Sequence, residues 1–158
     1  MINKTGLHND IDYVLLDQET LQRRVHELAE KLTNDYRGKN PVFLCILKGS
    51  VHFFSDLVRQ FDDYCEIDFL AISSYGNARK TSGIVRINIT GRHVIIVEDI
   101  MDSGLTLNHL TSMLRAREPA SLKIVALLDK PERRECAITP DYYGFVVPNE
   151  FVVGYGLD

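Results

Sequence analysis

Apolar residues follow two alternating patterns along this chain. Short apolar runs such as residues 42–47 are typical of strands buried on both faces of a parallel sheet. Between the runs, apolar residues recur every three or four positions, as in helices with one buried side. The predicted strands cover residues 42–47, 66–72, 84–87, 94–97, 123–128, 143–147 and 151–155. The predicted helices cover residues 19–36, residues 51–61 and a segment carrying Leu107, Leu110 and Leu114.

Strands that alternate with helices of this length predict an α/β fold, with a mainly parallel sheet flanked by helices. Residues 73–83 are small, polar or basic and lack apolar periodicity, so we expect a mobile polar loop there. No internal repeat, low-complexity segment or linker interrupts the sequence. We therefore expect residues 1–158 to form a single domain with one core and a small lobe contributed by both termini.

Composition and charge exclude several classes of protein. With 158 residues, 45% of them hydrophobic, the chain is long enough and apolar enough to bury a core. Its net charge of −4 argues against a nucleic-acid partner, because proteins that bind the phosphate backbone usually carry a basic patch. No run approaches the roughly 20 apolar residues of a membrane span. The first ten residues lack a hydrophobic signal core, so we expect a cytoplasmic protein.

The cysteines and histidines do not form a metal-binding or nucleophilic pattern in the sequence. Cys45, Cys65 and Cys136 lack metal-ligand spacing, and the five histidines are scattered. Cys45 and Cys65 border or lie within apolar runs, which indicates small buried side chains rather than nucleophiles.

Residues 94–106 concentrate the candidate chemistry. Glu98, Asp99 and Asp102 follow a β-branched run, and open α/β sheets place their ligands at the carboxyl ends of strands. Gly104 permits a positive φ, so that successive amides of the turn can face one anion at a helix N-terminus, and Thr106 is expected to cap that helix. Carboxylates beside an anion site suit a sugar phosphate accompanied by a divalent cation. The competing interpretation is a polar turn with solvated acids, which three acids at this spacing make the weaker one.

Other positions leave two interpretations open when read alone. The turn at residues 47–50 is either a close approach to a ligand or an ordinary tight connection. Lys130, after a predicted strand, is either a charged donor to a carbonyl oxygen or a solvated lysine. Residues 151–153 look simply like a core strand.

The sequence VIIVEDIMDSGLTL at residues 94–107 resembles the phosphoribosyl pyrophosphate signature of the type I phosphoribosyltransferases. Residues 47–50, 73–76 and 127–158 are similar to the hypoxanthine and hypoxanthine-guanine branch of that family, and the resemblance extends from about Leu16. It implies a type I phosphoribosyltransferase core with a small hood lobe, Mg²⁺ as cofactor, and a homodimer or homotetramer. It also implies transfer of a phosphoribosyl group to N9 of hypoxanthine or guanine, which belongs to purine salvage.

The resemblance also assigns the site residues. The phosphoribosyl pyrophosphate contacts are Lys48, Gly49, Glu98, Asp99, Asp102, Ser103, Gly104, Leu105 and Thr106. The purine contacts are Lys130, Phe151, Val152 and Asp158. The expected metal ligands are Glu98, Asp99 and Asp158, and the expected catalytic residue is Asp102. Ser74 and Tyr75 belong to a loop that closes over the reacting centre, and the Leu47–Lys48 peptide bond is expected to be cis.

Three points stay open at this stage. The chain departs from the resembled pattern in the short connection at residues 87–93 and in its end at Asp158, so flexible segments are either naturally short or absent from the sequence. Arg134 matches a basic position that serves either the substrate or the loop. The alternative functions are a non-catalytic regulator that binds nucleic acid, and a phosphoribosyltransferase for xanthine or a pyrimidine.

Overall fold

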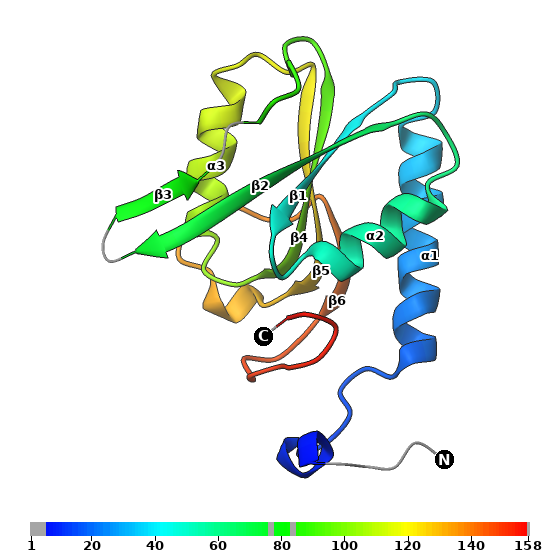
Figure 1. Cartoon of the computed structure of the whole chain (residues 1–158), viewed down its shortest axis with the longest axis vertical. Coiled ribbons are helices and arrows are strands. Elements are labelled where there is room, and N and C mark those ends of the chain that lie inside the picture. The colour runs from blue at the N-terminus through cyan, green and yellow to red at the C-terminus, as the bar shows by residue number, and fades with distance from the viewer. Residues whose placement is uncertain (1–5, 76–77, 83–84, 158) are drawn as a thin grey trace.

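A six-stranded sheet organises the part of the chain that the computed structural model describes, which is residues 6–75, 78–82 and 85–157 (Figure 1). Its order is β3-β2-β1-β4-β5-β6, and β3 alone runs antiparallel. The strands are β1 (Val42–Leu47), β2 (Glu66–Tyr75), β3 (Ala78–Ser82), β4 (His93–Met101), β5 (Ser121–Asp129) and β6 (Tyr142–Val146). The helices are α1 (Gln18–Asp35), α2 (Val51–Gln60) and α3 (Leu105–Arg115), with short 3-10 turns η1 (Gly6–Asp10) and η2 (Pro131–Arg133).

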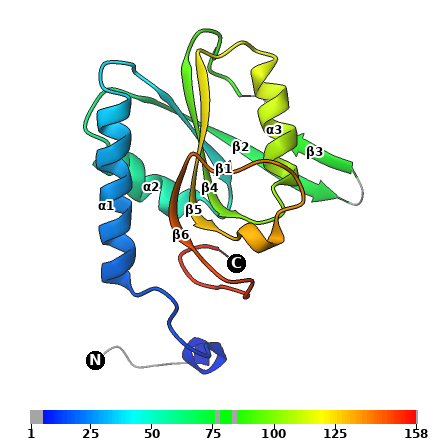
Figure 2. The same cartoon turned by 180° about the vertical axis from the view of Figure 1, so that it is seen from behind.

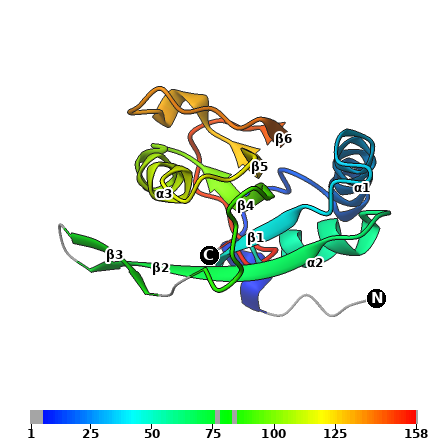
Figure 3. The same cartoon turned by 90° about the horizontal axis from the view of Figure 1, so that it is seen from above.

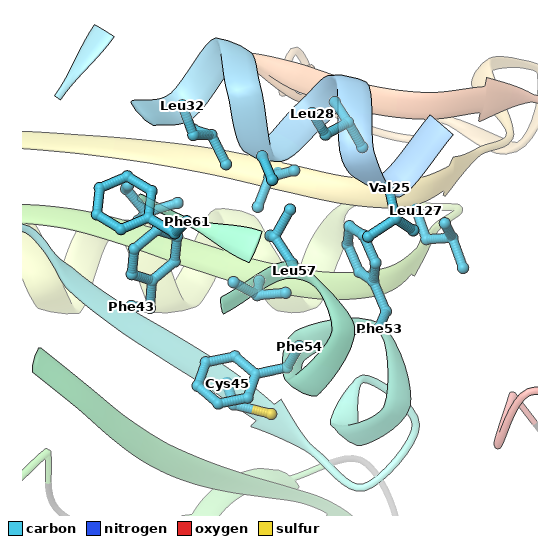
Figure 4. Close-up of a cluster of buried hydrophobic side chains, with 14 of the residues drawn as sticks. Val25, Leu28, Leu32, Phe43, Cys45, Phe53, Phe54, Leu57, Phe61 and Leu127 are labelled. Carbon is cyan, nitrogen blue, oxygen red and sulfur yellow. The ribbon is translucent and has the colours of Figure 1, made fainter. Parts of the chain in front are cut away.

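Helices cover the sheet on both faces. Figures 2 and 3 show α1 and α2 on one side and α3 on the other, with the sheet twisted between them. Because successive side chains of a strand point to opposite faces, β1 supplies both layers. Phe43 and Cys45 pack with α1 and α2 (Figure 4), whereas Val42 and Leu44 join the cluster that includes α3. The sheet is therefore buried on both faces, as its continuous apolar runs predict.

Most expected elements are confirmed. The helices expected at 19–36 and 51–61 and the strand at 42–47 agree with α1, α2 and β1 to within one residue at each end. Asp17 caps α1 by accepting the amide of Thr20 at 2.8 Å, as a helix N-terminus requires. The α/β class with a mainly parallel sheet is confirmed. None of the described helices has the length and apolar content needed to cross a membrane.

The expected polar loop at residues 73–83 is wrong in its described part. β2 continues to Tyr75 and pairs with β3 in an antiparallel hairpin, with Ser73 opposite Lys80 and Ser74 opposite Arg79. Backbone pairing holds this hairpin, and backbone pairing needs no apolar periodicity. In Figure 1 the hairpin projects beyond the body of the protein.

Two expected strands are not strands. Residues 85–87 of the segment expected at 84–87 are irregular, and the Asp68 carboxylate accepts the amides of Arg86 at 2.8 Å and Ile87 at 3.1 Å. Residues 151–155 are also irregular. Gly154 and Tyr155 have φ values of 92° and 53°, which a strand cannot accommodate.

A contact links segments near the two ends of the described chain. The Tyr13 hydroxyl donates to the Glu150 carboxylate, which links the segment before α1 to the segment after β6. Figure 1 shows the C-terminal segment passing below the carboxyl ends of the central strands. This contact agrees with the expected small lobe at the termini.

Candidate functional site

A cavity of about 220 Å³ opens at the carboxyl ends of β1, β2 and β4, beside the N-terminus of α3. This is the edge at which open α/β sheets bind their ligands. Its polar lining comes from Glu98, Asp102 and Thr106, and its apolar lining includes Leu47 and Ile72. The cavity therefore joins the 98–106 motif to Leu47 at the end of β1, whereas Lys48, Gly49 and Ser50 of the following turn are not part of its lining.

Glu98 lies deepest among the acids of the motif. It is 9% exposed, and its Oε1 accepts from the Ser50 hydroxyl at 3.3 Å and from the Asp99 amide at 3.1 Å. Burial, with a further contribution from Asp99, raises the pKa of Glu98 well above its usual range. This carboxyl therefore takes up a proton more readily than an exposed glutamate does.

Asp99 lies against the turn between β1 and α2. A Cβ built on Gly49 would stand 2.0 Å from Asp99 Oδ2, so only glycine leaves room for that carboxylate. The Leu47–Lys48 peptide bond in this turn is cis, as expected. Gly49 was expected to allow close approach of a ligand, and within the protein it allows close approach of Asp99.

Side-chain oxygens accept backbone amides within the turn at residues 102–106, which leads into α3. Asp102 Oδ1 accepts the Ser103 amide at 2.7 Å, and Ser103 Oγ accepts the Leu105 amide at 3.4 Å. Gly104 has a φ of 77° and is the N-cap of α3. The expectation that Thr106 caps the helix is wrong, because Thr106 is the second residue of α3. The N-terminus of α3 borders the cavity, where first-turn amides favour an anion.

Residues 134–138, which follow β5 and η2, contact the turn at residues 102–106. Arg134 donates from Nη1 to the main-chain oxygen of Asp102 at 2.7 Å, and its Nη2 forms an ion pair with Asp129. The Glu135 amide donates to the Ser103 carbonyl at 2.9 Å. A Cβ on Gly104 would meet Ile138 at 2.5 Å, so the two segments are in close contact. These contacts favour the loop-support role of Arg134.

Lys130 joins the turn to the C-terminal segment. Its amide donates to the Met101 carbonyl at 2.9 Å, and its Nζ donates to the Glu150 carbonyl at 2.5 Å. Phe151 is 89% exposed, whereas Val152 packs against the core cluster of α1 and α2. The structure thus brings Lys130 beside the chain that carries Phe151.

Comparison with known proteins agrees with this geometry. The model of the phosphoribosyl transferase domain matches residues 14–158. The chain belongs to the phosphoribosyltransferase family. The hypoxanthine-guanine phosphoribosyltransferase of Streptococcus pneumoniae strain R6 is 48% identical over 158 residues, which cover 96% of this chain and 88% of that protein.

Two further relatives extend the comparison. The crystal structure of a hypoxanthine phosphoribosyltransferase from Staphylococcus aureus, in its tetragonal form, superposes with a TM-score of 0.95 at 43% identity, covering 100% of this chain and 89% of that one. The bifunctional protein TilS/HprT of Listeria innocua is 49% identical over 159 residues. That match includes 97% of this chain, which spans only 24% of the length of the Listeria protein.

Three expected site residues have side chains outside the part of the chain that the structure describes. Asp158 lies outside the described residues. Ser74 and Tyr75 end β2 in backbone pairing with Arg79 and Ala78, and their side chains also lie outside the description. Among the residues that the structure describes, no three His, Cys, Asp or Glu side chains gather as a metal site, although Glu98 and Asp99 are adjacent.

Sequence reasoning missed two contributors to the site. Ser50 is fully buried and donates to Glu98, and its only signal was its place in the turn that precedes α2. Asp129 is 8% exposed and pairs with Arg134, and its only signal was an acid at the end of a buried strand. Cys45 is buried as expected, and burial with the nearby acids raises the pKa of its thiol to about 12.

Replacing Glu98 with Gln should stabilise the metal-free protein, and increasingly so at higher pH. The folded pKa of Glu98 exceeds the unfolded value of about 4.3, so ionisation costs the folded state stability as the pH rises above that value. Glutamine keeps the acceptor for Ser50 and does not titrate. In buffer without divalent cations we expect a Tm gain of about 3 °C at pH 8 that falls to almost none at pH 4.

The control for this prediction is Glu132→Gln at an exposed position, which should leave Tm unchanged at both pH values. A Tm difference for Glu98→Gln that does not vary with pH would contradict the assignment of a raised pKa.

Proposed function

We propose that the chain transfers the 5-phosphoribosyl group of phosphoribosyl pyrophosphate to N9 of hypoxanthine, and of guanine, in purine salvage. The products are IMP or GMP and pyrophosphate. The observation that carries the proposal is the cavity lined by Glu98, Asp102 and Thr106 together with Leu47, beside which the Lys130 amide donates to the Met101 carbonyl at the end of β4. Relatives named hypoxanthine-guanine phosphoribosyltransferase support the choice of base. We further propose that residues 1–158 act as one catalytic domain.

The phosphoribosyl half of the substrate is assigned to the acids and the turn. The amides of residues 102–106, together with the Ser103 and Thr106 hydroxyls, hold the 5′-phosphate at the N-terminus of α3. The Leu105 amide belongs to this set. Glu98 and Asp99 bind the ribose hydroxyls, and Lys48 and Gly49 bind the pyrophosphate. Ser74 and Tyr75 are assigned to a closing segment that excludes water from the reacting centre.

The purine is assigned to Lys130 and to the segment that carries Phe151 and Val152. Lys130 donates to the 6-oxo group, which selects hypoxanthine or guanine over adenine. The exposed ring of Phe151 stacks on the base, and Val152 contacts its edge through main-chain groups. In the reaction, the bond from C1 to the pyrophosphate oxygen breaks and the bond from C1 to N9 forms. Asp102 accepts the proton released from N7.

The carboxylates fit Mg²⁺ as a cofactor. Magnesium prefers oxygen ligands. Glu98 lines the cavity and Asp99 follows it in β4, so these two carboxylates are assigned to one ion, and Asp158 is assigned to a second. Held by these carboxylates, Mg²⁺ would supply positive charge to neutralise the departing pyrophosphate. For the protein as a whole we propose a homodimer or homotetramer. A cytoplasmic location is also proposed, because phosphoribosyl pyrophosphate is a charged metabolite of that compartment.

The decisive test is an assay with phosphoribosyl pyrophosphate, Mg²⁺ and each of hypoxanthine, guanine, xanthine and adenine. We expect turnover with hypoxanthine and guanine, loss of activity when EDTA removes the metal, and negligible use of adenine. Use of adenine without hypoxanthine would overturn the assignment of Lys130. Retardation of RNA or DNA by a protein that turns over no base would favour the regulator instead.

A further inference from the structure

The C-terminal segment is fastened to α2 by a tyrosine that the proposed chemistry does not use. The hydroxyl of Tyr155 donates to the Asp56 carboxylate, and its ring stacks on His52 with centroids 5.9 Å apart and planes at 21°. Burial and the bond to Asp56 raise the pKa of Tyr155, so the phenol remains a donor at neutral pH. Tyr155 thus contacts two successive turns of one helix.

The backbone on both sides of Tyr155 is in the left-handed region, and this conformation directs the Tyr155 side chain toward α2. Gly154, Tyr155 and Gly156 have φ values of 92°, 53° and 76°, and the Leu157 amide closes the turn on the Gly154 carbonyl at 3.0 Å. A tyrosine in the left-handed region costs about 1 kcal/mol. That cost persists only where other contacts offset it. Because the flanking glycines adopt the same region freely, the turn aims one side chain, that of Tyr155, at α2.

Its acceptor is held in place independently of the C-terminal segment. Gln22 of α1 donates to the same Asp56 oxygen at 3.1 Å, and Arg59 lies 3.7 Å from the other oxygen. Asp56 therefore belongs to the packed pair α1 and α2, which is a rigid platform for the segment.

The segment that Tyr155 fastens is the one assigned to the purine. Phe151 and Val152 stand four and three residues before Tyr155, respectively, with no regular secondary structure between them. Lys130 Nζ holds Glu150 at the start of the segment, and Val152, Tyr155 and Leu157 pack against the α1 and α2 cluster. An irregular segment keeps one arrangement only through such contacts, because no ladder of backbone bonds fixes it.

We propose that Tyr155 and Asp56 form a positioning pair that holds residues 151–157 in the arrangement that binds the purine. The inference rests on the proposed function, since it assumes that Phe151 and Val152 contact the base. Loss of the pair lowers the fraction of molecules with a competent purine site, and the apparent affinity for purine falls in proportion. The phosphoribosyl pyrophosphate contacts lie on other elements and are unaffected.

The test compares Tyr155→Phe and Asp56→Asn with Tyr142→Phe as a matched control. Tyr142 of β6 also donates to a carboxylate of a helix, Asp35, at 2.7 Å, but it lies at the opposite end of the sheet. For Tyr155→Phe we expect the KM for hypoxanthine to rise about fivefold, with kcat and the KM for phosphoribosyl pyrophosphate within twofold of wild type. Tyr142→Phe should leave all three parameters unchanged while losing a similar amount of thermal stability.

Coupling between the two residues gives a second measurement. If the pair acts as a unit, the double variant should have the same KM for hypoxanthine as Tyr155→Phe alone, because contacting partners are not additive. An unchanged KM for hypoxanthine in Tyr155→Phe, or an equal rise in both KM values, would overturn the inference. Absence of hypoxanthine turnover in the wild-type protein would instead overturn the proposed function, so the two failures are distinct.

Discussion

Replacing Asp102 with Asn should lower kcat with hypoxanthine about a thousandfold, within the range typical of general acid–base catalysis. The asparagine Oδ1 can still accept the Ser103 amide, which lies 2.7 Å from the aspartate, so the turn keeps its shape. The amide cannot accept the purine proton as the carboxylate does. Steady-state kinetics should therefore show a loss confined to kcat, with the KM for phosphoribosyl pyrophosphate and the Tm near their wild-type values.

Asp141→Asn is the matched control for this prediction. Asp141 also accepts a backbone amide, that of Ile124 at 2.8 Å, but it lies near the beginning of β5 and far along the sheet from the cavity. Its replacement should leave kcat unchanged. Retention of wild-type turnover by a folded Asp102→Asn protein would show that proton transfer has been assigned to the wrong residue.

The strands were predictable where polar residues or proline bound an apolar run on both sides. β1 was predicted correctly because Pro41 and Lys48 enclose its six apolar residues. β4 was predicted as residues 94–97, because the charges at 98 and 99 were taken as its end. In the structure Glu98 still pairs with Ala126, and β4 runs to Met101. Backbone pairing is indifferent to side-chain charge, so the acids lie within the strand that positions them.

Residues 151–155 show that apolar composition does not specify secondary structure. Residues 151–155 are apolar enough for a strand, but burial can be satisfied by an irregular chain as well as by a sheet. Val152 and Tyr155 reach the core while Gly154 and Tyr155 adopt left-handed backbone. The resemblance assigned Phe151, Val152 and Lys130 to the purine, but it carried no information on the contact of Tyr155 with Asp56.

In the candidate site, too, some features were predictable from the sequence and others were not. Gly104 and the Leu47–Lys48 bond have the backbone geometry that the motifs implied. The capping role of Thr106 was wrong because the left-handed Gly104 starts the helix two residues earlier. The pairing of Asp129 with Arg134 could not be derived from spacing, because the five-residue separation spans the 3-10 turn η2 and depends on how that turn folds back.

Replacing Arg134 with Met should destabilise the fold by about 2–3 kcal/mol and raise the KM for phosphoribosyl pyrophosphate. The side chains of Arg134 and Asp129 are only 12% and 11% exposed, so the variant leaves a poorly hydrated carboxylate without its partner. It also removes the donor to the Asp102 carbonyl, which helps to fix the phosphate-binding turn. Urea unfolding measures the stability, and steady-state kinetics measure the KM.

Arg133→Met is the matched control, because Arg133 is exposed and donates only a long 3.4 Å bond to Asn149. It should change the free energy of unfolding by less than about 0.5 kcal/mol. Adding Asp129→Asn to Arg134→Met should recover part of the lost stability, since the cost comes from an unpaired charge, but it should not restore the KM. If the double variant recovers the KM as well, Arg134 does not support the turn through the Asp102 carbonyl and acts only by neutralising Asp129.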